Sequence, residues 1–329
     1  MSERLELIEK IEAVTGWVIK PKRFRIITDT TEWMDIHRGH VIRLEGRDFV
    51  VRGNMNEPRF GIEDQPKMWV FSAIDLDTRE EKIIKTVFNE EFIAHIGIFK
   101  IRCYRSQDKE SKVLETVKGD KRFMQGETLY DDEGNNVRII NYIKGKKFFH
   151  YVPNIEKSHL KYFEEDLPGI LHNLFDAVLA IQDLHKLGLN HGDIRNDHIL
   201  IDAETGIYRW IDFDLNQDVM DFDLWSIGNI LSYAVAKGIK SYEIVMKSKE
   251  FTNEVKNSLT FDDSSAFYEY RIMNLRKLYP YIPDKLSEIL QHFTMRPKAF
   301  YCCIEELVDD FAGMLETEFP HGKEISAVS

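Results

Sequence analysis

Residues 191–198 read His-Gly-Asp-Ile-Arg-Asn-Asp-His, and residues 211–214 read Ile-Asp-Phe-Asp. Between these two segments lie two short apolar runs separated by Ala-Glu-Thr-Gly, a pattern that predicts a β-hairpin. Because a hairpin returns the chain to the place where it began, Asp212 is expected to lie beside Asp193. The apolar stripe from Leu171 to Leu184, which precedes the first segment, predicts a buried helix.

The residue types in these segments suit phosphoryl transfer. Two carboxylates at one edge of a short sheet fit a base next to a divalent-metal site, because Mg²⁺ selects oxygen ligands. Arg195, two residues after Asp193, places a cation within reach of the same space, and phosphoryl transfer relies on such neutralisation of phosphate oxygens. Taken singly, Asp193, Asp212 and Asp214 are more typical of loop caps and turns. Their combination across a hairpin favours the functional interpretation.

This arrangement resembles the protein-kinase-like superfamily, which includes eukaryotic-type protein kinases and phosphotransferases of the aminoglycoside and choline kinase type. Residues 191–193 are similar to the HGD form of the catalytic loop, which implies that Asp193 is the catalytic base. Residues 212–214 resemble the D-F-G motif in its D-x-D variant, which implies that Asp212 is a metal ligand. The run Asp-Leu-Trp-Ser-Ile-Gly that begins at Asp223 resembles the start of a long C-lobe helix and implies that Asp223 supports the catalytic loop.

The resemblance also implies a nucleotide clamp in the strand-rich half. The run Lys-Ile-Ile-Lys at 82–85 is similar to the V-A-I-K strand, so Lys85 would contact the phosphates. Lys82 is the alternative, and because the two residues are three apart on a strand, only one of them can face the cleft. The helix that starts near residue 109 resembles the αC helix, so Glu110 would be the partner of Lys85, with Glu115 as a nearby alternative.

Two further segments are candidates for contacts with the nucleotide. The run 140–145 resembles the hinge of the family, which implies that the backbone of Asn141, Tyr142 and Ile143 meets adenine. No G-x-G-x-x-G or Walker-type loop occurs in the sequence. The segment from Gly53 to Gly61 is the nearest candidate for a loop that covers phosphates, and an ordinary hairpin loop is an equal alternative.

His198 departs from the family pattern, because it stands where the family keeps an asparagine that binds metal. Neutral imidazole suits softer ions better than Mg²⁺. Either Asp214 supplies the second metal contact, or Mn²⁺ is preferred with His198 as a ligand, or the chain binds nucleotide without turning it over. A purely structural role of His198 in the loop also remains open.

The stretch from Phe213 to Phe222 is too short for a regulated activation loop. It contains no A-P-E motif and no Ser, Thr or Tyr, so control by phosphorylation of this stretch is not expected. Small-molecule phosphotransferases share the short segment, whereas the helix that begins at Asp223 and the run 282–290 look more like protein kinases. The acceptor therefore stays open between a protein and a small-molecule hydroxyl.

Composition limits the partners of the chain. It has 329 residues, with 44 Lys and Arg against 56 Asp and Glu, and a formal charge of −12. This acidic balance argues against a protein that coats nucleic acid, because phosphates would be repelled. The charged start is unlike a signal peptide, and no apolar run is long enough for a membrane span. Cys103, Cys302 and Cys303 lack disulfide or zinc spacing, with the adjacent pair expected on a helix. We expect a cytoplasmic protein with no nucleic-acid or membrane partner.

Strand-rich sequence to about residue 145 followed by helical sequence predicts an α+β protein. By resemblance this is a bilobal protein-kinase-like fold, with an N-lobe at 38–147 and a C-lobe at 148–329. Residues 1–37 are predicted to form an N-terminal extension, with a helix and a basic strand near 20–25. That basic stretch is either a solvated strand face or a docking site for a partner.

Taken together, the motifs predict a phosphotransferase that moves the γ-phosphate of ATP to a hydroxyl, with Mg²⁺ or Mn²⁺ as cofactor and most similar to a protein Ser/Thr kinase. A small-molecule phosphotransferase and a nucleotide-binding scaffold without activity are the alternatives. A metal-hydrolase cluster of His191, Asp193, His198 and Asp212 is a weaker one, because it leaves Lys85 unexplained.

Overall fold

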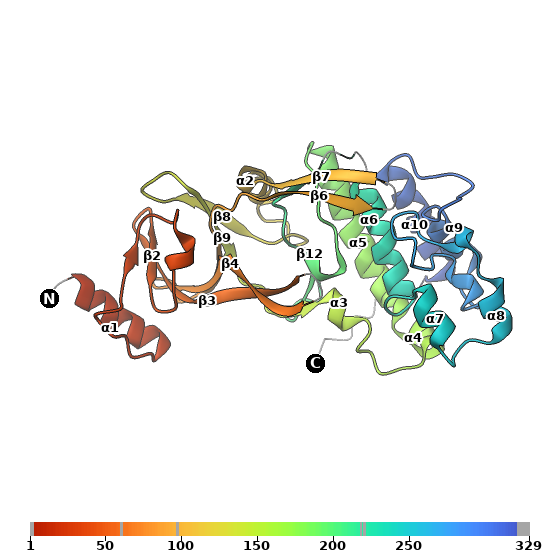
Figure 1. Cartoon of the computed structure of the whole chain (residues 1–329), viewed down its shortest axis with the longest axis horizontal. Coiled ribbons are helices and arrows are strands. Elements are labelled where there is room, and N and C mark those ends of the chain that lie inside the picture. Colours follow the sequence, from red (N-terminus) through yellow and green to blue (C-terminus); the bar gives the residue numbers. More distant parts are fainter. Residues whose placement is uncertain (1–2, 60–61, 97–98, 218, 220–221, 321–329) are drawn as a thin grey trace. The chain divides into compact units, whose positions relative to one another are not determined.

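The computed structural model describes residues 3–59, 62–96, 99–217, 219 and 222–320 (Figure 1). The chain forms two compact units. The first comprises Met1–Glu90, Arg105–Asp120 and Met124–Ile143, and the second comprises Glu91–Tyr104, Lys121–Phe123 and Lys144–Ser329. Strands dominate the first unit and helices the second, so the expected α+β class is confirmed.

A seven-stranded sheet forms the first unit, in the order β1-β2-β3-β4-β5-β9-β8. Its strands are β1 (Ile26–Ile27), β2 (Val41–Leu44), β3 (Arg47–Arg59), β4 (Ile62–Asp75), β5 (Glu81–Lys85), β8 (Gly126–Tyr130) and β9 (Asn136–Asn141). Only β1 and β2 pair in parallel, and the other pairs are antiparallel. The helices of this unit are α1 (Glu3–Thr15), the 3-10 turn η1 (Trp33–Asp35) and α2 (Gln107–Thr116).

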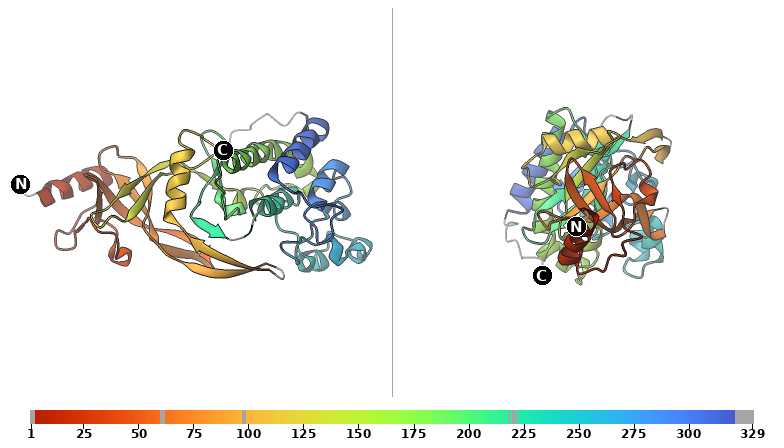
Figure 2. Two further views of the ribbon diagram at one scale, coloured as in Figure 1. Left: turned by 90° about the horizontal axis from the view of Figure 1, so that it is seen from above. Right: turned by 90° about the vertical axis from the view of Figure 1, so that its left-hand side faces the viewer.

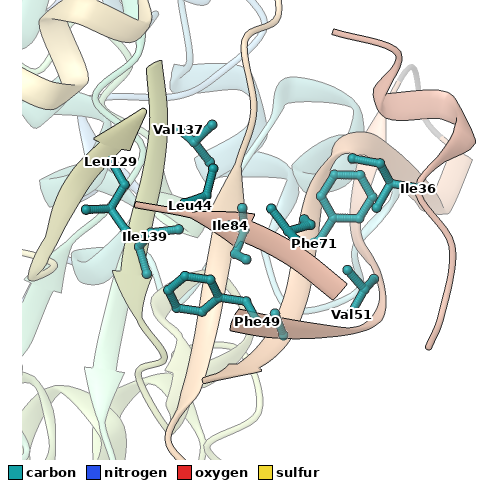
Figure 3. Packing of buried hydrophobic residues seen from close by; sticks show 11 residues of the cluster. Ile36, Leu44, Phe49, Val51, Phe71, Ile84, Leu129, Val137 and Ile139 are labelled. Carbon is teal, nitrogen blue, oxygen red and sulfur yellow. The ribbon is translucent and has the colours of Figure 1, made fainter. Parts of the chain in front are cut away.

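Both faces of this sheet are covered, because alternate residues of a strand point to opposite sides. On β3, Phe49 and Val51 join a core with Phe71 and Ile84, as Figure 3 shows. Val50 points the other way and packs in a second cluster with the apolar stripe of α1, which consists of Leu7, Ile8 and Ile11. The amphipathic N-terminal helix expected from the sequence is therefore part of the first unit.

Two sequence expectations in this unit concern segments whose conformation differs from the prediction. Residues 53–59 were predicted as a loop but belong to β3, which continues to Arg59 and pairs with β4 through backbone hydrogen bonds, and their contact with phosphates stays a prediction. Gly53 lies at a register shift of this pairing with φ +152, and Gly61 lies outside the described residues. The basic stretch near residue 20 is a turn rather than a strand, since the N–H groups of Arg23 and Phe24 donate to the carbonyl of Lys20.

The second unit is mostly helical and carries two small sheets. Its helices are α3 (Phe148–Tyr151), α4 (His159–Glu165), α5 (Leu167–Lys186), α6 (Phe222–Val235), α7 (Tyr242–Lys247), α8 (Asn253–Ser258), α9 (Asp284–Gln291) and α10 (Ile304–Glu318), with 3-10 turns η2 (Asn196–His198), η3 (Phe261–Asp263) and η4 (Leu275–Lys277). The predicted buried helix is α5, and α10 packs against it (Figure 2). None of the helices in the described ranges has the length and apolarity to cross a bilayer.

The predicted hairpin consists of β11 (Ile199–Asp202) and β12 (Tyr208–Trp210), and β10 (Gly145–Lys147) pairs with β11. A second sheet was not expected from the sequence. In it, β13 (Leu215–Gln217) pairs with β7 (Phe99–Arg105), which pairs with β6 (Glu91–Ile96). The strand that follows the Asp-Phe-Asp motif is therefore held by a hairpin from a distant part of the chain.

The cysteines occupy different surroundings. Cys103 is buried with Ile101 and Leu215, where the β6–β7 hairpin meets β13. Cys302 is exposed in a bend, and Cys303 precedes the first residue of α10 as its N-cap. The expectation that the adjacent pair lies on a helix is therefore wrong, because α10 begins one residue later, at Ile304.

A buried histidine makes the stability of the second unit sensitive to pH. His159 stacks on Tyr279 with ring centroids 3.4 Å apart, and its Nε2 lies 2.8 Å from the carbonyl oxygen of Val235. Burial lowers the pKa of His159 to about 4, against an opposing hydrogen bond to Val235. Because the unfolded value is near 6.5, the unfolded chain binds the proton first as the pH falls.

We therefore expect the free energy of unfolding to fall by roughly 3 kcal/mol between pH 6.5 and pH 4 through this residue. Denaturant unfolding of wild type and His159→Gln across this range measures the effect, and the variant should show a flatter profile. The exposed His150 supplies the control His150→Gln, which should keep the wild-type slope. Equal slopes for wild type and His159→Gln would contradict the assignment.

Candidate active site

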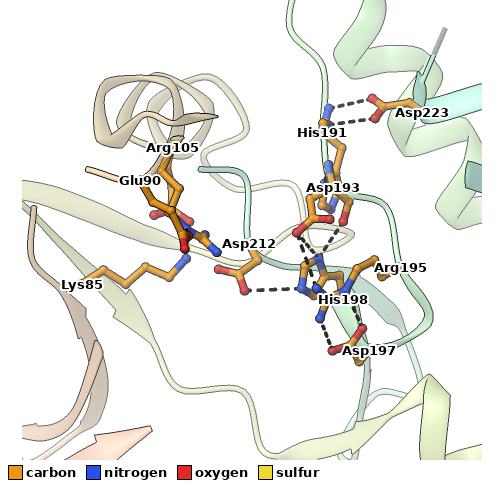
Figure 4. Close-up of polar contacts among 12 residues, drawn as sticks. Lys85, Glu90, Arg105, His191, Asp193, Arg195, Asp197, His198, Asp212 and Asp223 are labelled. Atoms are coloured by element: carbon orange, nitrogen blue, oxygen red, sulfur yellow. Dashed lines mark hydrogen bonds and ion pairs between the residues drawn. The ribbon is translucent and has the colours of Figure 1, made fainter. Parts of the chain in front are cut away.

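The catalytic-loop candidate follows α5 and is anchored by a buried carboxylate at the start of α6. Asp223 accepts hydrogen bonds from the backbone N–H groups of His191 at 2.7 Å and Gly192 at 2.8 Å. Its Oδ2 also lies 2.9 Å from Nε2 of His185, near the end of α5. Gly192 has φ +83, a conformation that glycine adopts without strain. The motif residue Asp223 thus holds the backbone of the loop, as Figure 4 shows.

Asp223 is fully desolvated yet stays ionised. Burial raises the pKa of this carboxyl, but the hydrogen bond from His185 and the charges of His191 and His185 outweigh burial, and the backbone N–H of Gly192 adds to them. The net result is a pKa below the usual value for aspartate. The negative charge is therefore a permanent part of the loop's support at neutral pH.

His198 lies between the two predicted catalytic carboxylates (Figure 4). Its Nδ1 is 2.6 Å from the backbone carbonyl of Asp193 and 3.6 Å from Oδ2 of the same residue. Its Nε2 is 3.5 Å from Oδ2 of Asp212. The hairpin thus brings Asp212 back to the loop of Asp193, and the imidazole spans the space between them.

The tautomer of His198 follows from these contacts. A distance of 2.6 Å to a carbonyl oxygen requires a proton on Nδ1, which leaves the lone pair of a neutral ring on Nε2. That lone pair and the carboxylate of Asp212 are both acceptors and face each other at 3.5 Å. Such a pair fits a cation or a proton between them.

Asp212 is held in a rare backbone conformation. Its φ of +70 is uncommon for a residue with a side chain and occurs preferentially at functional sites. The next residue, Phe213, is fully buried, and its ring lies 4.4 Å from that of His191. Asp214 is also buried and directly precedes β13. Asp212 is therefore followed directly by a buried phenyl ring and, after Asp214, by a paired strand.

Arg195 is fixed by a residue that the sequence interpretation did not assign. Asp197 accepts two hydrogen bonds from its guanidinium, at 3.0 Å from Nε and 2.6 Å from Nη2. Burial raises the pKa of Asp197, but the hydrogen bond from Arg195 and the charge of Arg195 lower it well below its usual range. Nη1 of Arg195 also lies 4.0 Å from Oδ2 of Asp193. The arginine is thus held next to the proposed base.

Asp212 and His198 fit a divalent cation that takes its remaining ligands from phosphates and water. Within the described ranges, no group of three or more His, Cys, Asp or Glu side chains is arranged to hold a metal ion. Mg²⁺ commonly takes one or two protein carboxylates and completes its shell with phosphates and water. Asp212 and the lone pair of His198 match that mode. The hydrolase cluster is not supported, because the His191 ring packs on Phe213 and Trp210.

In the first unit, the predicted lysine and glutamate are in contact. Nζ of Lys85 lies 2.6 Å from Oε1 of Glu110, which is completely buried on α2. Lys82 instead donates to Glu80 and to Asn141, as the opposite strand register requires. Glu115 lies on the exposed side of α2. The geometry therefore selects the pair Lys85 and Glu110, whose function stays a prediction.

Glu110 has a second cationic partner that the sequence did not reveal. Nε of Arg138, on β9, lies 3.3 Å from Oε2 of Glu110. The same guanidinium donates to the carbonyl oxygens of Asn136 at 2.8 Å and Thr86 at 3.1 Å. Asn136, two residues earlier on the same face of β9, bonds to Asp108 and Ser111 of α2. Strand β9 therefore ties down the first half of α2.

Removing the Arg138 side chain is expected to destabilise the protein strongly. In Arg138→Leu the buried Glu110 loses one of its two cations, and breaking a buried ion pair costs about 3–5 kcal/mol. Denaturant unfolding measures this cost. Arg52, which pairs with Glu81 at the surface of the same sheet, is the matched control, and Arg52→Leu should cost about 1 kcal/mol or less. Equal costs for the two variants would refute the role of Arg138.

The hinge candidate ends β9. The N–H of Asn141 donates to the carbonyl of Gln125 at 2.8 Å, and that of Tyr142 donates to Glu81 at 3.2 Å. Both N–H groups are therefore used inside the first unit. Ile143 follows them as the last residue of that unit.

Comparison with known proteins supports a kinase relationship. The chain is similar to Serine/threonine-protein kinase 1 of African swine fever virus (isolate Pig/Kenya/KEN-50/1950), with 26% identity over 170 residues, which are 48% of this chain and 54% of the relative. It is also similar to Serine/threonine-protein kinase MRCK gamma of Mus musculus, with 33% identity over 114 residues. The resemblance to the protein-kinase-like superfamily is confirmed.

The kinase matches cover only parts of these relatives. The chain spans 54% of the viral protein from Kenya, 28% of that from the isolate Tick/Malawi/Lil 20-1/1983 at 30% identity, and 6% of the mouse protein. No family model matches the chain. The relatives support a kinase-like phosphotransferase in general, and a general use of ATP and Mg²⁺.

Proposed function

We propose that this kinase-like protein transfers the γ-phosphate of ATP to a Ser or Thr hydroxyl of a protein. The observation that carries the proposal is His198, which links the backbone of Asp193 to the carboxylate of Asp212. Its Nδ1–H donates to the backbone carbonyl of Asp193, and its Nε2 faces Asp212, the candidate metal ligand. One side chain thereby sets the spacing between the base and the cation site.

Each predicted residue receives one role in this proposal. Asp193 accepts the proton of the attacking hydroxyl, and Arg195, held by Asp197, neutralises phosphate oxygens next to it. Lys85 contacts the phosphates, and Glu110 orients Lys85. Asp212, with His198 or Asp214, holds Mg²⁺ or Mn²⁺, which when bound offsets the charge of the triphosphate.

Adenine recognition is assigned to the end of β9. The N–H groups of Asn141 and Tyr142 are already used, so their carbonyl groups and the backbone of Ile143 are the contacts that we propose for the base. The phosphate contact of Gly53 stays a prediction, since the pairing of its strand does not test it. Residues 38–147 and 148–329 are proposed as the two lobes. The helix and basic turn before them are proposed as a docking site for a partner, and the cytoplasm as the location.

The segment after Asp212 supports a site that needs no activating phosphorylation. Protein kinases order this segment through a phosphorylated residue. Here β13 begins three residues after Asp212 and pairs with β7, and Leu215 is buried against Ile101 and Cys103. Strand pairing thus replaces phosphorylation in this proposal.

Transfer of label from γ-labelled ATP tests the function. Wild type, Asp212→Ala and Lys85→Ala are incubated with a serine-containing protein substrate, or with choline and kanamycin as small-molecule acceptors. Label on protein that is lost in both variants supports the proposal. Label only on a small molecule would reassign the acceptor, and nucleotide binding without any transfer would indicate a scaffold.

The identity of residue 198 is expected to set the preferred metal. Imidazole nitrogen favours Mn²⁺ over Mg²⁺, whereas an amide oxygen suits Mg²⁺. We expect His198→Asn to raise the ratio of Mg²⁺-supported to Mn²⁺-supported transfer by about tenfold, a change near 1.4 kcal/mol. Rates over a titration of each metal measure the ratio, with His191→Asn as the control for imidazole loss outside the metal site. An unchanged ratio in His198→Asn would remove His198 from the metal site.

A further inference from the structure

A small cavity lies beside the catalytic loop in the second unit. Its volume is about 180 Å³, and its wall includes Ile194 and Arg195 of the loop. Ile230 and Asn229 of α6 line the same cavity, as do residues of the segment 268–271. The lining therefore combines apolar side chains with charged and polar groups, and of these residues the proposed phosphoryl transfer uses Arg195 and its partner Asp197.

Arg271 brings an uncompensated positive charge to this cavity. Its guanidinium carbon lies 4.1 Å from the ring centre of Tyr268 and 5.4 Å from that of Tyr270, and its Nε donates to the Tyr270 hydroxyl at 3.3 Å. In the part of the chain that the structure describes, no carboxylate forms an ion pair with Arg271. Stacking on aromatic rings holds a guanidinium in place and leaves its edge available for an anion.

The cavity shares one residue, Arg195, with the surroundings of the proposed base. Arg195, which lines it, lies 4.0 Å from Asp193. Burial raises the pKa of the Tyr268 hydroxyl, the charge of Arg271 opposes the rise, and the charge of Asp193 adds to it. Tyr268 is therefore within electrostatic range of both the second arginine and the catalytic carboxylate.

Arg195 forms an ion pair with Asp197, whereas Arg271 forms no ion pair among the described residues. Asp197, which also lines the cavity, accepts two hydrogen bonds from Arg195 and offsets its charge, so Arg271 is the lining arginine that has no carboxylate partner among the described residues. Arginine binds carboxylates and phosphates through paired N–H groups, and such charge-assisted bonds are stronger than neutral ones. In a chain of net charge −12, a lining arginine without a carboxylate partner among the described residues favours an anionic group on the substrate.

We propose that this cavity binds an anionic side chain of the acceptor, a carboxylate or a phosphate, close to the hydroxyl that is phosphorylated. The proposal rests on the protein-kinase function above, because it identifies the flanking sequence of the acceptor. The apolar side chains that line the cavity contact the aliphatic part of the acceptor's side chain, and Arg271 binds its anionic group. Arg271 is a specificity residue and takes no part in the transfer itself.

Seven-residue peptides with a single acceptor serine test the proposal. The residues that flank the serine are Glu, phosphoserine, Ala or Lys in four parallel sets, and the enzymes are wild type, Arg271→Ala, Arg271→Glu and Arg296→Glu. Arg296 is an exposed arginine of the same unit that lies outside this cavity, so its variant matches the change in net charge. The readout is kcat/KM for label transfer to each peptide.

Wild type is expected to favour the Glu or phosphoserine peptides over the Ala peptides by at least tenfold, and the better of these two sets identifies the anion. Arg271→Ala should lose that preference while its rate on Ala peptides stays within twofold. Arg271→Glu should favour Lys peptides, and Arg296→Glu should behave like wild type. Equal preference in wild type and Arg271→Glu, or the same shift in Arg296→Glu, would overturn the proposal.

A binding measurement separates the cavity from the proposed activity. Fluorescence anisotropy with the Glu and phosphoserine peptides, in which alanine replaces the acceptor serine, needs no turnover. A tenfold weaker affinity in Arg271→Glu without any transfer in wild type would retain the anion site and refute the kinase function. If wild type transfers label but neither binding nor rate depends on Arg271, the kinase function would be retained and the anion site would be refuted.

Discussion

Asp193→Asn is expected to slow phosphoryl transfer by about 10²–10⁴-fold, the range that a general base supplies. The amide has the shape of the carboxylate, so the contact between His198 and the backbone carbonyl of Asp193 is kept. The charge that faces Arg195 at 4.0 Å is lost together with the proton acceptor. The fall should therefore appear in kcat at saturating ATP, with little change in the melting temperature.

Asp183→Asn is the matched control for this substitution. Asp183 is a carboxylate of the same unit that pairs with Arg122 near the surface, at 2.9 Å. Its variant should transfer label within twofold of wild type. A similar loss of rate in both variants, or a rate in Asp193→Asn within tenfold of wild type, would remove Asp193 from the role of base.

Asp223→Ala is expected to give a large loss of stability, about 3–5 kcal/mol. The variant leaves two buried N–H groups, those of His191 and Gly192, without their acceptor, and His185 without its partner. Because these N–H groups hold the catalytic loop, transfer should be lost even where the protein remains folded. Denaturant unfolding gives the stability, and Asp183→Ala, with an expected cost of about 1 kcal/mol or less, is the control.

The dependence of stability on pH shows whether Asp223 stabilises the protein through its charge or only through its shape. The pKa of Asp223 in the folded state lies below the usual value near 3.9, so its stabilisation is complete above pH 3.9 and is lost as the pH falls through the folded value. Asp223→Asn should therefore be less stable than wild type at pH 7, and the gap should narrow below pH 3.9. A constant gap across this range would show that charge is not the cause.

The parts of the site that sequence could anticipate are those that local patterns encode. The hairpin between residues 199 and 211 brings Asp212 back to the catalytic loop because turn residues separate two apolar runs. The strand of Lys85 and the helix of Glu110 were recognisable from apolar spacing and family motifs, and their side chains meet. Local patterns were sufficient for the hairpin, and the resemblance to family motifs was needed for Lys85 and Glu110.

Contacts between segments that are far apart in the sequence could not be predicted from local patterns. A single Arg138 in a strand has the pattern of any polar residue that alternates with apolar ones, and only tertiary packing places it on Glu110. The pairing of β13 with β7 was missed because the two strands are far apart in the sequence. The polar residues after Gly53 suggested a loop, but the length of β4 provides backbone partners for them.

The pairing of β13 with β7 limits the fragments of this chain that can fold on their own. Residues 91–104 belong to the second unit, although the chain on both sides of them belongs to the first. Residues 121–123 repeat this exchange on a smaller scale. Neither unit is thus a continuous module, and a fragment that starts at Lys144 lacks two strands of one of its own sheets. We therefore expect the two units to fold only when they are expressed together as one chain.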